Sequence, residues 1–204
     1  SYTLLSVVNP ILENGGKQIN VLDFGGACGA HYFHLRSLIN SSLKLNWVVV
    51  ETPTMVKYAK ELENDELKFF DNFSEAKAYL GNVDFIHTSG TLQCVDKPKQ
   101  YLDYILDCNA KWILFSRLGL SKKNKDVITI HTSKLSWNGI GELPEGHQDK
   151  WVKYPFTFSS ETNFLNSIKS KYEIKAHFHD SSGMFEVNGE EIVGYGVLCK
   201  SIAV

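Results

Sequence analysis

Five residues near the start of the chain have the types and spacing of a small-molecule binding site. An apolar run ends in Asp23. A glycine-rich turn follows at once, with Gly25, Gly26 and Gly29, and a second apolar run ends in Glu51. A buried strand, a turn that lets a ligand touch the backbone, a helix N-terminus and a second strand tipped by a carboxylate are the parts of a nucleoside site. The pattern predicts that Glu51 accepts hydrogen bonds from ribose hydroxyls and that the glycines fix the path of the turn.

The acid before the glycines indicates which nucleoside is bound. Dinucleotide sites carry Gly-x-Gly-x-x-Gly so that a pyrophosphate can approach the backbone. Here Ala27 stands two positions after Gly25, which breaks that register, and Asp23 would face an anionic pyrophosphate unfavourably. The same carboxylate suits a ligand that has a cationic end and no phosphate. S-adenosylmethionine, with its sulfonium and amino groups, is therefore the expected cofactor.

Apolar runs alternate with helix-like stretches, and this rhythm predicts the elements that position these residues. Thr52 followed by Pro53 opens one helix, and Ser74 is expected to cap another. Asn188-Gly189 predicts an antiparallel hairpin near the end of the chain. The expected strands are 19–24, 45–51, 67–70, 83–87, 111–115, 173–179, 184–187 and 191–200, and the expected helices are 2–12, 30–39, 53–62, 75–80, 98–108 and 160–169. Repeated βα units predict one α/β domain over residues 1–204, with a mostly parallel sheet and helices on both faces.

The alternation of apolar runs and helix-like stretches stops between residues 118 and 154. This stretch is long and rich in turn residues, and its pattern is compatible with one strand at 126–131. A long irregular segment in a compact domain is usually a lid or a binding insertion. We expect it to lie near the acceptor site, where Trp137, Trp151 and Tyr154 either stack on the acceptor or anchor the insertion to the body.

Composition excludes several classes of protein. The 204 residues carry a net charge of −2, and arginine occurs only at positions 36 and 117, which argues against a nucleic-acid partner. The cysteines are far apart in the sequence and are expected to be reduced thiols of a cytoplasmic protein. No apolar run approaches the ~20 residues of a membrane span. No acidic cluster follows the fourth and fifth strands, so no divalent metal is expected; the oligomeric state is left open.

Four segments resemble the motifs of class I S-adenosylmethionine-dependent methyltransferases. Asp23-x-Gly25-x-x-x-Gly29 is similar to their first motif, and Val-Val-Val-Glu at 48–51 resembles the second. Residues 84–93 and 112–117 are similar to the motifs that follow strand four and form strand five. The resemblance implies a Rossmann-like fold with a seven-stranded sheet that ends in an antiparallel hairpin. It also implies that Asp23 reaches the amino group of the cofactor, directly or through water.

Shorter segments resemble a family of bacterial methyltransferases associated with surface-polysaccharide biosynthesis. They are residues 22–26, 89–93, 128–131 and 154–156, and His131 stands where that family has glutamine. This resemblance implies transfer of a methyl group to a small molecule or a glycan.

Other residues at strand ends are expected to complete the cofactor site. Asp71 or Asn72, after the third strand, is expected to contact adenine, with helix capping as the alternative. Thr88, Ser89 and Gly90 lie where the fourth strand opens onto the cofactor, and Ser89 could equally be a turn residue.

Methyl transfer to a hydroxyl needs alignment of the reactants and usually a base. The histidines that could serve are His31, His34, His87, His131 and His147. We rank His131 and His147 first as catalytic residues because they lie in the insertion, although any one of them could be a surface or packing histidine.

Together these features predict a methyltransferase that O-methylates a sugar hydroxyl. Two alternatives stay open. One is a non-catalytic partner protein that keeps the methyltransferase fold. The other is a nicotinamide-dependent oxidoreductase, against which the broken dinucleotide motif counts.

Overall fold

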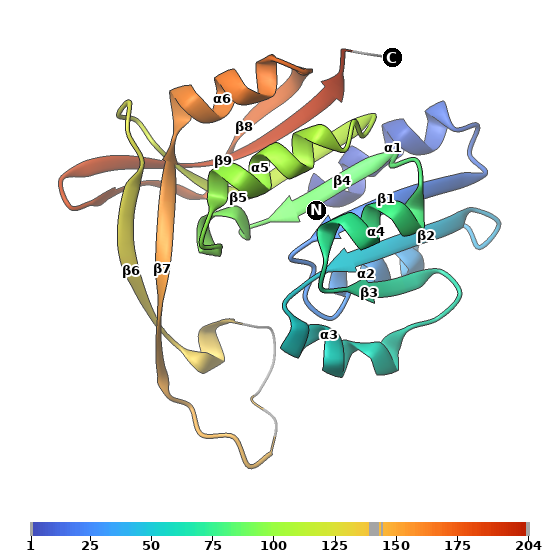
Figure 1. The fold of residues 1–204 in the computed structure, drawn as a ribbon, viewed down its shortest axis with the longest axis horizontal. Coiled ribbons are helices and arrows are strands. Elements are labelled where there is room, and N and C mark those ends of the chain that lie inside the picture. Colours follow the sequence, from blue (N-terminus) through green and yellow to red (C-terminus); the bar gives the residue numbers. More distant parts are fainter. Residues whose placement is uncertain (1, 139–142, 144, 203–204) are drawn as a thin grey trace.

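A computed structural model describes residues 2–138, 143 and 145–202, with side chains described from Leu5 onward except at 138 and 180–182. Seven of the nine strands of the sheet lie in the order β3-β2-β1-β4-β5-β9-β8, with helices on both faces of the sheet (Figure 1). β9 runs antiparallel between β5 and β8. The strands are β1 (Gln18–Phe24), β2 (Lys44–Val50), β3 (Leu67–Phe70), β4 (Phe85–Ser89), β5 (Trp112–Ser121), β8 (Tyr172–Val187) and β9 (Glu190–Ser201). The predicted α/β architecture with a final antiparallel hairpin is confirmed.

The two faces of the sheet are covered by two sets of helices. One core lies between the sheet and α1 (Tyr2–Glu13), α2 (Ala30–Leu38) and α3 (Pro53–Ala59), and the other lies under α4 (Phe73–Leu80), α5 (Pro98–Asp107) and α6 (Glu161–Lys169). Because both faces are buried, the central strands are nearly continuous apolar runs. In the described part of the chain, no helix is both long and apolar enough to cross a membrane.

Parallel register brings the polar ends of three strands to one edge of the sheet. Asp23 pairs with Val49 on one side and with His87 on the other. Glu51 therefore follows the end of β2 beside the turn that follows β1. Ligand sites of open α/β sheets lie at this edge.

Two helix starts test the predicted caps. Thr52 caps α3 as predicted, because its side chain accepts a hydrogen bond from the Met55 N–H. The helix then tightens into a 3-10 turn, η1 (Lys60–Leu62). The prediction that Ser74 caps α4 is wrong: the Asn72 side chain accepts from the N–H groups of Ser74 and Glu75, so the helix begins one residue earlier than Ser74.

The stretch expected to be irregular is largely a β-hairpin, so the sheet has nine strands rather than seven. β6 (Val127–Lys134) and β7 (Trp151–Ser160) pair antiparallel along their length. β5 is longer than predicted and meets β7 where Leu120 lies opposite Ser159. Figure 1 shows the hairpin beside the carboxyl-terminal edge of the sheet.

The strand expected at 126–131 corresponds to β6, so β7 is the part of this hairpin that the sequence pattern missed. Val127 and Phe158 pack with Ile192 of β9, while Ile128 and Ile130 on the other face are exposed. Pro155 stands inside the run that forms β7, and a proline within such a run argues against a strand.

Candidate functional site

A groove of about 420 Å³ opens where β1 and β2 end. Its volume is within the range of small-molecule sites. Four of the predicted cofactor residues line it: Gly25, Glu51, Asp71 and Asn72. The remaining lining residues are Phe24, Val50, Thr52, Pro53, Phe73, Ser74, Thr91, Val95, Tyr101 and Tyr104.

Glu51 is held in place by two backbone donors. Its Oε1 accepts from the Ala27 N–H at 3.1 Å, and its Oε2 accepts from the Thr52 N–H at 2.9 Å. A carboxylate has about four lone-pair sites, so each oxygen can accept a further hydrogen bond. The side chain is thus a pre-oriented acceptor pair that links the turn after β1 to the start of α3.

Gly25 allows the turn after β1 to lie against the loop after β4. Its φ is +75°, and a Cβ there would lie 2.0 Å from Thr91 Oγ1. No larger residue fits this position without moving the loop. The predicted role of this glycine in fixing the path of the turn is therefore explained by close packing as well as by its conformation.

Asp23 lies beneath the turn rather than in the wall of the groove. It is 1% exposed, and a Cβ on Gly26 would lie 2.4 Å from its Oδ2. The Trp47 Nε1–H donates to Oδ2 at 3.3 Å, and Nδ1 of His87 lies 3.0 Å from Oδ1. The expected contact of Asp23 with a ligand stays a prediction; the structure shows a carboxylate with two internal partners.

Electrostatics keep this buried carboxyl ionised. Burial by itself would raise the pKa of Asp23, but attraction to His87 and His31 and a hydrogen bond with His87 outweigh it and lower the pKa below its ordinary value. The pKa of His87 is lowered, chiefly by burial and further by repulsion from His31 and Arg117, although Asp23 opposes this change.

The residues predicted at the end of β4, Thr88, Ser89 and Gly90, do not line the groove. Ser89 Oγ accepts from Nε of Arg117 at 2.9 Å, and the Ser89 carbonyl accepts from the same guanidinium at 3.2 Å. Gly90 lies against this guanidinium, with a φ of +70°. Thr88 is buried, and among the described residues its hydroxyl has no hydrogen-bond partner. Of the predicted glycines, Gly29 precedes the first residue of α2.

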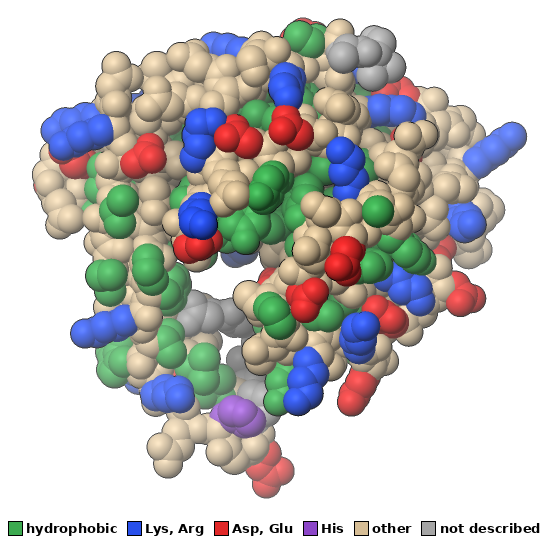
Figure 2. Space-filling model, viewed as in Figure 1, with side chains coloured by type: hydrophobic (Ala, Val, Ile, Leu, Met, Phe, Trp, Pro, Cys, Tyr) green, Lys and Arg blue, Asp and Glu red, His purple; other side chains and the backbone are tan. Residues whose placement is uncertain are grey.

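The two predicted catalytic histidines do not line the groove. His131 is exposed on β6, with its ring centroid 5.1 Å from that of Tyr154 and 5.3 Å from that of Phe156. His147 is exposed in the segment before β7. The space-filling view is hollowed between the hairpin and the rest of the molecule (Figure 2). The assignment of either histidine to catalysis stays a prediction.

Sequence reasoning missed the aromatic wall of the groove. Tyr101 and Tyr104 are three residues apart on α5, and Phe73 is the first residue of α4. The rings of Phe24 and Tyr101 stack with centroids 5.1 Å apart. The spacing of the two tyrosines on one helix face was a usable signal, but it is equally typical of a core contact.

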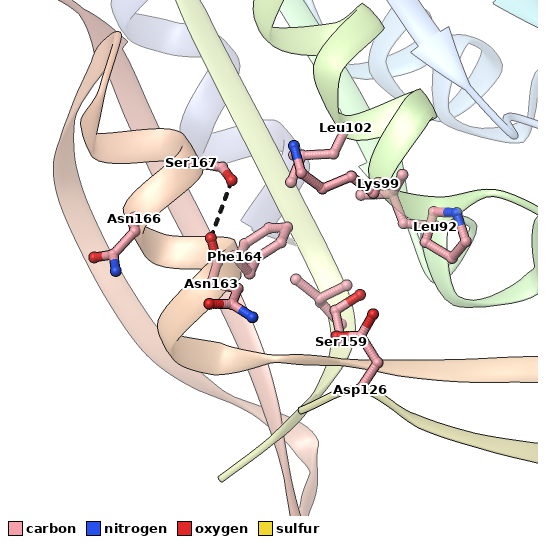
Figure 3. A pocket seen from close by; sticks show the side chains of 11 residues that line it. Leu92, Lys99, Leu102, Asp126, Ser159, Asn163, Phe164, Asn166 and Ser167 are labelled. Carbon is pink, nitrogen blue, oxygen red and sulfur yellow. Dashed lines mark hydrogen bonds between the residues drawn. The ribbon is translucent and has the colours of Figure 1, made fainter. Parts of the chain in front are cut away.

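A second cavity, of about 440 Å³, lies between α5 and α6 (Figure 3). Leu92, Leu102 and Phe164 form apolar walls, while Lys99 and Asp126 lie at its rim. None of the predicted cofactor residues lines it. It is separate from the groove at the ends of β1 and β2.

Comparison of sequences finds no protein-family model and no curated protein that matches this chain. Solved structures do match its fold. The N-terminal domain of EvdMO1 with bound S-adenosylhomocysteine has a TM-score of 0.53 at 13% identity, over 90% of this chain and 74% of that one.

Two further matches cover almost the whole chain. The N-methyltransferase NodS from Bradyrhizobium japonicum WM9, in complex with S-adenosylhomocysteine, has a TM-score of 0.53 at 10% identity, over 98% of this chain and 86% of NodS. Magnesium protoporphyrin IX methyltransferase from Synechocystis PCC 6803, also with S-adenosylhomocysteine, has a TM-score of 0.52 at 14% identity, over 98% of this chain and 82% of that one. The chain thus has the Rossmann-like fold of class I methyltransferases.

Proposed function

We propose that this protein is a methyltransferase that binds S-adenosylmethionine in the groove at the ends of β1 and β2. The observation that carries the proposal is Glu51, an acceptor pair held at this edge by the N–H groups of Ala27 and Thr52. An acid at this position suits the two hydroxyls of a ribose. Structures with the same fold contain S-adenosylhomocysteine, the demethylated form of the cofactor.

The other groove residues fit the same ligand. Because Gly25 has no side chain, the backbone next to Glu51 is open to a ligand, and the rings of Phe73 and Tyr101 offer apolar surface for the adenine base. Asn72 keeps its role as an adenine contact in this proposal, although its Oδ1 also caps α4. Its side-chain NH₂ group remains a donor for a ring nitrogen.

We propose a sugar hydroxyl as the methyl acceptor and the side of the hairpin as its place. The bound cofactor supplies an activated methyl group. The protein must align the acceptor oxygen with it, exclude water and accept the hydroxyl proton. His131 lies on β6 with Tyr154 and Phe156 beside it, an aromatic surface suited to the apolar face of a sugar ring. His131 and His147 are the proposed bases.

Calorimetry tests cofactor binding. Titrations with S-adenosylmethionine, S-adenosylhomocysteine and NAD should show binding of the first two alone. Glu51→Ala should weaken S-adenosylmethionine binding about 100-fold, because two hydrogen bonds to a charged acceptor contribute about 1.5 kcal/mol or more each. The matched control is Glu61→Ala, which removes an exposed acid on η1 and should leave Kd unchanged. Binding of NAD alone, or equal affinity in both variants, would overturn the proposal.

Transfer is tested with labelled cofactor. Incubation with a lysate that contains candidate glycans, followed by identification of the labelled product, should show label on a sugar oxygen. His131→Ala or His147→Ala should reduce the transfer rate without changing Kd for the cofactor. Tight cofactor binding without transfer to any acceptor would instead favour a non-catalytic partner protein.

A further inference from the structure

Asp23, His31 and His87 converge beneath the turn that follows β1. Nδ1 of His87 lies 3.0 Å from Asp23 Oδ1, and Nδ1 of His31 lies 3.5 Å from Asp23 Oδ2. One ligand atom from each of the three side chains lies within 4.8 Å of the others. The three residues come from β1, α2 and β4, and none of them lines the groove.

One nitrogen of this cluster is left unsatisfied. Nδ1 of His31 is buried and, among the described residues, has no hydrogen-bond partner. A separation of 3.5 Å from the carboxylate is too long for a good hydrogen bond. A buried polar atom without a partner is costly and calls for a physical explanation. Its position, with a carboxylate oxygen and a second imidazole nearby, is that of a ligand atom.

The surroundings of the carboxylate are also those of a metal ligand. The indole N–H of Trp47 donates to Oδ2 of Asp23 and fixes its orientation, as outer hydrogen-bond partners do around bound metals. Gly26 leaves the space beside Oδ2 free of a side chain. The His31 side chain is 33% exposed, whereas those of Asp23 and His87 are almost fully buried. An ion could therefore enter along His31.

We propose that Asp23, His31 and His87 bind a divalent transition-metal ion, with Zn²⁺ as the best fit. Two imidazoles and one carboxylate are a ligand set that suits zinc rather than Mg²⁺ or Ca²⁺. Metal bonds of about 2.0–2.2 Å place ligand atoms roughly 3–4 Å apart, and two of the present separations are already 3.0 and 3.5 Å. Small side-chain rotations would complete the site, with the fourth position at the exposed edge of His31.

The site would tie three elements together at the cofactor turn. The ion would join the end of β1, the first turn of α2 and β4. This inference reverses the expectation from the sequence that no divalent metal is bound. It does not depend on the proposed methyltransferase activity.

Metal titration tests the proposal with the ion alone. The experiment uses the full chain carrying Cys28→Ser and Cys94→Ser, which remove two exposed thiols that would compete for zinc. Calorimetry with Zn²⁺ should show one equivalent bound. Co²⁺ should give visible absorption bands of a four- or five-coordinate site that excess Zn²⁺ abolishes, and Mg²⁺ should not compete.

A pair of histidines on one helix provides the decisive comparison. His31→Ala should weaken Zn²⁺ binding at least about 100-fold, since loss of an outer partner alone costs 10- to 100-fold. His34→Ala removes an exposed histidine on the same helix and should leave affinity unchanged. His31 is near the surface, so its variant should fold, which thermal melting of the metal-free proteins checks. Absence of stoichiometric binding, or equal affinity in the two variants, would overturn the proposal.

Discussion

Substitution of Gly25 by alanine measures how closely the two loops of the groove must pack. Two effects add at this position. The φ of +75° is disfavoured for any L-residue, at a cost of about 1–2 kcal/mol. The new Cβ would also lie 2.0, 2.4 and 2.6 Å from three atoms of Thr91. Relief of such an overlap by movement of the loop costs about 1–3 kcal/mol.

Gly189 provides the matched control for the backbone effect. It has the same φ of +75° in the β8–β9 turn, and a Cβ there would meet nothing within 4 Å. Gly189→Ala should therefore lower the free energy of unfolding by about 1–2 kcal/mol, and Gly25→Ala by about 2–5 kcal/mol. For a chain of this size these losses correspond to decreases in Tm of roughly 2–8 °C and 4–20 °C.

A double-mutant cycle separates the overlap from the backbone term. Thr91→Gly removes all three atoms that the new Cβ would meet. In that background Gly25→Ala should cost only the backbone term, which gives a coupling of about 1–3 kcal/mol between the two positions. Urea unfolding of the four proteins measures it.

Cofactor affinity is the second measurement. Gly25→Ala displaces the turn that lies beside Glu51, so we expect S-adenosylmethionine binding to weaken at least about tenfold, a loss of 1.4 kcal/mol or more. Gly189→Ala should leave Kd unchanged. If the two variants were equally stable and bound the cofactor equally well, close packing of the turn against Thr91 would not be needed for the site.

Three further results are expected. Burial raises the pKa of Cys108 to about 11 and that of Cys199 to about 12, so at pH 8 about one in a thousand or fewer of these thiols is ionised. A thiol reagent should therefore label the exposed Cys28 rapidly, and should label Cys108 and Cys199 only when the protein unfolds. Asn72→Ala removes the acceptor of two N–H groups at the start of α4 and should lower the free energy of unfolding by about 1 kcal/mol in urea titrations. Phe158→Ala leaves a cavity beside β9 and should cost about 3–5 kcal/mol, measured by thermal unfolding.

The parts of the site that are local in sequence could be predicted. Glu51 follows an apolar run, and Gly25 stands in a glycine-rich turn, so each position is visible from its immediate neighbours. Parallel pairing of β1 with β2 then brings them to one edge without further information. The same argument placed Asp71 and Asn72, because they follow β3, the next strand in the sheet.

The parts that depend on distant partners could not be predicted. His87 and Asp23 are 64 positions apart, and whether they meet depends on which face of each strand they occupy. The helix cap of α4 was predicted wrongly for a more local reason. Both Asn72 and Ser74 are good caps, and only the observed geometry shows that Asn72 reaches two N–H groups.

The position of Asp23 changes the way in which it can select a cationic ligand. The sequence suggests a direct contact, but the carboxylate lies behind Gly26 and is already bonded to Trp47. Its charge still acts through the glycine turn, because no side chain fills that space. At an effective dielectric constant of about 20, two unit charges some 6 Å apart interact by roughly 3 kcal/mol. The proposed preference for a cationic end of the cofactor would therefore need no contact, only an ionised Asp23.

Metal binding would change the sign of the electrostatic potential that the Asp23 site produces at the glycine turn. A dication held by Asp23 and two neutral imidazoles leaves a net positive charge beneath the turn, which favours the carboxylate of the cofactor over its amino group. The affinity for S-adenosylmethionine, which has both groups, should then change less on zinc binding than the affinity for an analogue that lacks the carboxylate. In His31→Ala this difference between the two ligands should disappear. The two proposals for this edge of the sheet are thus linked through one charge, that of Asp23.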